Sequence, residues 1–97
     1  MSPLILLVRD AAAADPELGV ALRTIEEDRL TRMRHNAQVL AARGFLRDTV
    51  TVVAAGDLMW TLTAPELYEL LVMRRGWTPE QLGELVATTM IAALLPP

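Results

Sequence analysis

The stretch PELGVALRTIEEDRLTRMRHNAQVLAAR, from Pro16 to Arg43, decides the fold because it has the pattern of one long amphipathic helix. Asp15 stands where an N-cap is expected, Pro16 takes the first helical position, and Gly44 is a typical helix stop. At 100° per residue, one narrow apolar stripe contains Leu18, Leu22, Ile25, Met33 and Leu40. A helix of about 28 residues is about 40 Å long, longer than a domain of this size is wide. We therefore predict that it is the spine for the other helices.

The other helices are predicted from apolar periodicity between breaker residues. They cover residues 3–14, 51–62, 63–75 and 78–95. Val52-Val53 could begin a strand, but the small residues 54–57 that follow favour a helix with a small-residue face. We predict an all-α fold in one domain over residues 1–97, an antiparallel bundle of four to five helices.

Three threonines are expected to begin three of these helices. Thr51 is placed as the N-cap of the helix over 51–62. Two further pairs have capping-box spacing, namely Thr63 with Glu66 and Thr78 with Gln81. Gly76 is expected to end the helix over 63–75.

Composition points to a partner surface and away from nucleic acid. Hydrophobic residues make up 53% of the 97 residues, which exceeds what one small core needs. The net charge is −3, and the arginines are mixed with acidic residues along the long helix. A free-standing nucleic-acid binder carries a basic face, so we expect no direct DNA or RNA binding by this chain.

The sequence offers little for catalysis, metal binding or membrane insertion. There is no cysteine and one histidine, His35, which lies off the apolar stripe and is expected to be solvated. The apolar run Leu4–Val8 is too short for a membrane span of about 20 residues and lacks the basic region of a signal peptide. No phosphate-binding loop or catalytic triad is found. We expect no enzymatic activity, no cofactor and a cytoplasmic location.

Polar residues in the apolar stripe are the candidates for a binding site. Arg29 and Asn36 fall in this stripe, and polar groups on a buried face need partners. One interpretation is that they orient an apolar effector in a pocket between the long helix and the helix over 51–62. Its other predicted contacts are Met33, Ala37, Leu40, Trp60 and Tyr68. The alternative is internal: Arg29 pairs with Glu26 or Asp57, and the aromatic residues pack in the core or in a dimer interface.

Several stretches resemble the C-terminal domain of TetR/AcrR transcriptional regulators. They are ADPEL at 14–18, LAARGFLR at 40–47, WTLTAPELY at 60–68, RGWTPE at 75–80 and LLP at 94–96. In this order and spacing, the stretches together span nearly the whole chain. The resemblance is limited to about the last four helices of such regulators and includes no helix-turn-helix.

This resemblance implies a regulatory domain that binds an effector and forms a homodimer. Segments of about 51–75 and 78–95 would pair with those of a second copy as a four-helix bundle. The expected interface residues are Leu67, Leu71, Leu82, Leu85, Val86, Thr89, Met90 and Ala93. An alternative is a free-standing dimerisation protein that forms mixed dimers with a full-length regulator.

Overall fold

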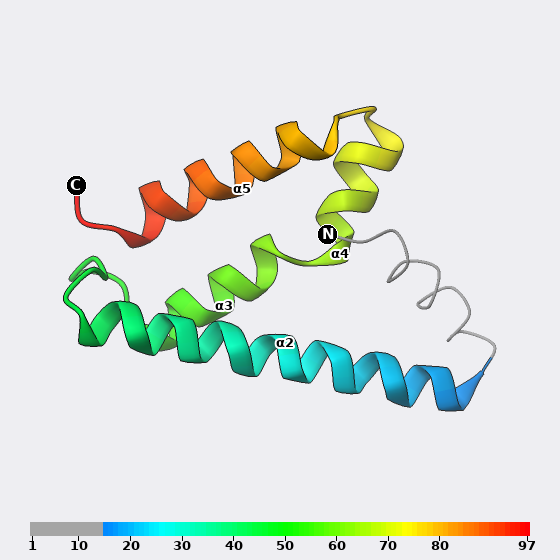
Figure 1. The fold of residues 1–97 in the computed structure, drawn as a ribbon, viewed down its shortest axis with the longest axis horizontal. Coiled ribbons are helices and arrows are strands. Elements are labelled where there is room, and N and C mark those ends of the chain that lie inside the picture. The colour runs from blue at the N-terminus through cyan, green and yellow to red at the C-terminus, as the bar shows by residue number, and fades with distance from the viewer. Residues whose placement is uncertain (1–14) are drawn as a thin grey trace.

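The computed structural model describes residues 15–97, and all regular structure in this range is helical (Figure 1). The elements are α2 (Pro16–Ala42), α3 (Val52–Leu62), the short α4 (Pro65–Leu67), the π-helix η1 (Tyr68–Arg74) and α5 (Pro79–Leu94). The all-α prediction is confirmed for these residues, and the helix ends agree with the predicted ones to within two residues. The helix predicted over residues 3–14 lies outside the described part of the chain.

Helices α2, α3 and α5 run side by side, each antiparallel to the one before it (Figure 1). Helices α4 and η1 turn the chain between α3 and α5 at one end of the molecule. The most extensive packing is between α2 and α3, as expected for a long helix that acts as a spine. Helix α5 packs against α3 and η1 and has no comparable contact with α2. Within residues 15–97, α3 therefore lies at the centre of the helix packing, with contacts to both α2 and α5.

Local capping explains where most helices begin and end. Asp15 accepts a hydrogen bond from the Glu17 amide at 2.9 Å, and Thr51 accepts one from the Ala54 amide at 3.1 Å. At α5 the predicted capping box is complete, because Thr78 and Gln81 each bond the other's backbone amide. The chain leaves α2 and η1 through Gly44 and Gly76, both at φ +75°, a conformation that favours glycine. These local predictions are confirmed.

The predicted capping box of Thr63 and Glu66 is wrong. The N-cap of α4 is Ala64, which has no side-chain capping bond, and Pro65 takes the first position. Thr63 is instead the C-cap of α3, where its hydroxyl donates to the Met59 carbonyl at 2.8 Å. After one α-helical turn the segment continues as the π-helix η1, which the sequence did not indicate.

The buried core is small, and half of its residues are alanines. Ala37 of α2, Ala55 and Met59 of α3 and Leu94 of α5 form the buried cluster, and both alanines are fully buried. Beside them, a Cβ atom added to Gly56 would lie 3.2 Å from Cα of Arg34. The α2–α3 contact thus depends on residues small enough to let the two backbones approach closely.

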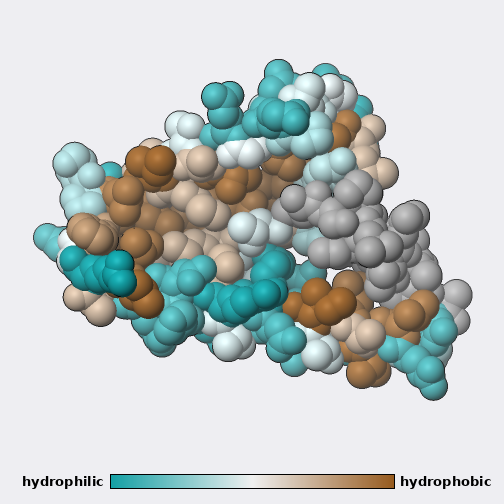
Figure 2. Space-filling model, in the orientation of Figure 1, coloured by the Kyte–Doolittle hydropathy of each residue, from teal (hydrophilic) through white to brown (hydrophobic). Residues whose placement is uncertain are grey.

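The molecule is thin and open for its length. Its principal extents are 44 × 30 × 15 Å, and at about 8–10 Å between helix axes the shortest extent leaves room for no more than two helix layers. The radius of gyration is 15.1 Å, against about 12 Å for a compact chain of this length. Much apolar surface therefore stays exposed, and Figure 2 shows it gathered over α3 and α5 beside the more polar α2.

Candidate functional site

Arg29 joins α2 to the C-terminal end of α3. Its guanidinium donates to the Trp60 carbonyl, to the Thr63 hydroxyl at 2.7 Å and to the Glu26 carboxylate at 2.6 Å. It also lies over the Trp60 ring, 5.1 Å from the centroid. The Arg29 side chain is only 13% exposed, so these contacts compensate its desolvation. Of the two internal partners that the sequence suggested, Glu26 is the one found.

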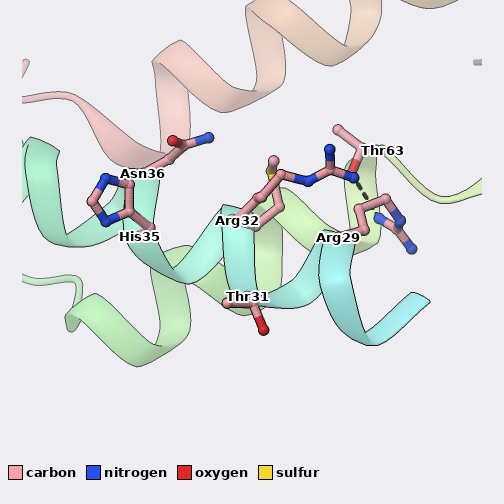
Figure 3. A pocket seen from close by; sticks show the side chains of 7 residues that line it. Arg29, Thr31, Arg32, His35, Asn36 and Thr63 are labelled. Carbon is pink, nitrogen blue, oxygen red and sulfur yellow. Dashed lines mark hydrogen bonds between the residues drawn. The ribbon is translucent and has the colours of Figure 1, made fainter. Parts of the chain in front are cut away.

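A shallow surface cavity of about 660 Å³ lies beside this arginine (Figure 3). Its lining residues are Arg29, Thr31, Arg32, Met33, His35, Asn36 and Thr63. Asn36 and His35 are exposed and lie at the opposite end from Arg29 and Thr63. Three predicted ligand contacts, Arg29, Met33 and Asn36, thus share one open cavity, in which every lining side chain except Met33 carries a polar group.

The structure separates the other four predicted ligand contacts. Ala37 belongs to the α2–α3 core and Leu40 packs against it, so the space expected for an effector between these helices is filled by protein. Trp60 is half-buried, with its ring under Arg29. Tyr68 lies on η1 and lines a different cavity.

This second cavity is an apolar groove bounded by the end of α3, by η1 and by α5. Its volume is about 460 Å³, within the range of small-molecule sites. We call it the α5 groove, and its lining residues are Leu62, Thr63, Tyr68, Pro79, Leu82, Gly83, Val86, Ala87 and Met90. None of these side chains is charged, and only Thr63 and Tyr68 offer a hydroxyl. The groove is therefore suited to an uncharged, mainly apolar occupant.

The predicted interface residues are also divided by the structure. Leu82, Val86 and Met90 line the α5 groove, and Leu82 is only 6% exposed. Leu85 is 40% exposed. The remaining members of the predicted set are Leu67, Leu71, Thr89 and Ala93, which are half-buried, as are Val86 and Met90. The most exposed apolar residues of η1 and α5 were not in the predicted set: they are Leu70, Met73 and Ile91, each more than half exposed.

The apolar residues of α5 are spread widely around the helix, and this spread is the sequence signal that could have indicated an exposed apolar residue at Ile91. At 100° per residue, the apolar positions of α5 extend over about 240°, from Leu85 through Val86 to Ile91. The polar residues Gln81, Glu84 and Thr88 lie in the remainder, while Glu80, next to Ile91, and Thr89 lie within the apolar arc. A helix that packs on one side only needs a narrower apolar stripe. Helix α5 thus has more apolar surface than α3 and η1 cover.

The described residues show neither a metal centre nor a membrane span. Among residues 15–97, no three potential metal ligands come together. No helix in this range has the length and apolar character needed to cross a membrane. Comparison with protein-family models, curated proteins and solved structures finds no match for this chain.

Proposed function

We propose that this chain is a regulatory module of the TetR/AcrR type, which associates with a second copy through η1 and α5 and binds an uncharged effector in the α5 groove. The observation that carries the proposal is the wide apolar circumference of α5, of which α3 and η1 cover only a part. Two of the sequence stretches that resemble such regulators, at residues 60–68 and 75–80, flank the π-helix that leads into α5.

The exposed area is sufficient for a dimer. The accessible surface is 6536 Å², against about 5500 Å² for a compact protein of this mass. The excess of about 1000 Å² is comparable to the roughly 800 Å² that each partner buries in a standard interface. Association with a second copy would therefore bring the exposed surface to that of a compact protein.

The charge distribution permits association of two identical copies only through an uncharged surface. Two copies with a net charge of −3 repel each other unless the surfaces in contact are uncharged. The exposed large apolar residues of η1 and α5 are Leu70, Met73, Leu85 and Ile91. Around α5, Ile91 lies between Glu80 and Glu84, whereas Leu85 lies about 100° or more from both carboxylates. The part of this surface around Leu85 meets the condition.

The experiment is the solution mass of the chain by light scattering over the micromolar range, with one matched pair of variants. We expect a mass of two chains for the wild type. Leu85→Glu places a charge at the apolar edge of α5 and is expected to shift the mass to one chain, with helicity retained by circular dichroism. Thr88→Glu adds the same charge at an exposed polar position of this helix and is expected to remain a dimer.

Two results would count against this proposal. A wild type that stays monomeric throughout this range would show that the exposed surface of α5 does not bind a second copy. If both variants remain dimeric, the interface lies elsewhere on the molecule.

A further inference from the structure

Thr63 lies where the two cavities meet. It lines the α5 groove together with Tyr68 and Leu82, and it also lines the open cavity beside Arg29. Its hydroxyl accepts a hydrogen bond from Arg29 at 2.7 Å and donates one to the Met59 carbonyl at 2.8 Å. A single half-buried side chain therefore connects the apolar groove to the long helix α2.

We infer that the α5 groove takes an uncharged, mainly apolar molecule and that Thr63 transmits its binding to α2 through Arg29. The inference rests on the proposed function, for which it names the ligand class and the residue that couples the site to the rest of the module. The ligand class follows from the lining, because a charged group placed among these residues would lose its hydration without gaining a partner of opposite charge.

The coupling follows from how tightly Arg29 is held. Its guanidinium has three acceptors, and two of them, Trp60 and Thr63, belong to the last turn and C-cap of α3. A ligand that moves this end of α3 must stretch these bonds or move Arg29 with them. Since Arg29 lies within a continuous helix of 27 residues, its displacement passes along the helix axis. The distance from Arg29 to the Pro16 end is about 20 Å.

The test is an amide NMR titration of the full chain with cyclohexanol, an uncharged and mainly apolar probe. In the wild type we expect two sets of amide signals to shift with the same midpoint: groove residues such as Gly83 and Ala87, and the α2 residues around Arg29. Thr63→Val keeps the shape of the side chain but removes the hydroxyl. It is expected to retain the groove shifts and to lose more than half of the amplitude of the α2 shifts.

Two control variants separate the hydroxyl of Thr63 from general effects on stability. Thr61→Val removes the matching hydroxyl two residues earlier, which donates to the Asp57 carbonyl at 2.8 Å but lies exposed and does not contact Arg29. For Thr61→Val we expect the groove amides and the α2 amides to shift as in the wild type. Thr63→Ser keeps the hydroxyl and is likewise expected to retain the α2 shifts.

The possible results are distinct. If the α2 shifts persist at full amplitude in Thr63→Val, the role of Thr63 is rejected and the groove remains a binding site. If no groove amide moves in the wild type, the ligand class and the coupling are both rejected. Light scattering on the same samples decides separately whether the chain is a dimer, so failure of the proposed assembly is not confused with failure of the coupling.

Discussion

The substitution Gly56→Ala tests the contact between α2 and α3 that organises the fold. A Cβ atom at this position would lie 3.2 Å from both Cα and Cγ of Arg34. The favourable separation between carbon atoms is about 3.5–4.0 Å, so both neighbours must move away by a few tenths of an ångström. Cγ belongs to a flexible side chain, but Cα moves only if α2 shifts against α3.

The magnitude follows from two opposing effects. Alanine is a better helix former than glycine by about 1 kcal/mol, which favours the variant. Overpacking a close contact typically costs about 1–3 kcal/mol. We expect a net loss of about 1 kcal/mol in the free energy of unfolding, which corresponds to a decrease in Tm of about 4–8 °C for a domain of this size.

Gly83→Ala is a matched control for this prediction. Gly56 and Gly83 each take the fifth position of their helix, but a Cβ on Gly83 would meet no atom within 4 Å. The propensity gain is therefore unopposed, and Gly83→Ala is expected to raise the free energy of unfolding by about 1 kcal/mol. The two variants should thus differ by about 2 kcal/mol.

The assay is urea denaturation followed by circular dichroism, at one protein concentration for all variants because association contributes to apparent stability. A Gly56→Ala variant as stable as Gly83→Ala would refute the close approach of α2 and α3 at Gly56. An equal loss of stability in both variants would point to a general effect of the added methyl group.

Further predictions concern the side chains that hold the helices in place. Arg29→Lys is expected to lower the free energy of unfolding by about 1–2 kcal/mol in urea denaturation, because a single ammonium group cannot reach all three acceptors. As a control, Arg32→Ala removes an exposed arginine of the same helix and should change the free energy of unfolding by less than about 0.5 kcal/mol. Thr78→Ala removes one half of the capping box of α5 and should cost about 1 kcal/mol by the same assay, while an unchanged midpoint would show that this cap contributes nothing to stability.

The helices and most of their ends could be predicted because the interactions that define them are local. A cap such as Thr78 bonds a residue three positions away, and a helix stop such as Gly44 depends on the conformation of one residue. The failure at Thr63 has the same origin. Its spacing to Glu66 fits a capping box, but Thr63 can bond either forward to the next helix or backward to α3, and the sequence does not show which one it takes.

The candidate site could be predicted only in part. The stripe on α2 correctly indicated that Arg29 needs a partner, and Glu26, three residues away, could be proposed from helical spacing. The acceptors at Trp60 and Thr63 are 31 and 34 residues away, so they depend on how α2 crosses α3. The same holds for the α5 groove, in which Tyr68 lies with three residues that the resemblance assigned to a dimer interface.

Arg47 shows most simply the difference between what the sequence specifies locally and what depends on tertiary packing. Nothing in its sequence context separates it from the other arginines, yet its amide donates to the Leu94 carbonyl at 2.7 Å and its guanidinium to the Ala92 carbonyl at 2.9 Å. These bonds tie the turn between α2 and α3 to the end of α5, and the positive charge complements the helix dipole there. Local hydrogen bonding and periodicity thus specify the helices from the sequence alone. The site arises from contacts between residues far apart in the chain, which exist only once the helices have packed.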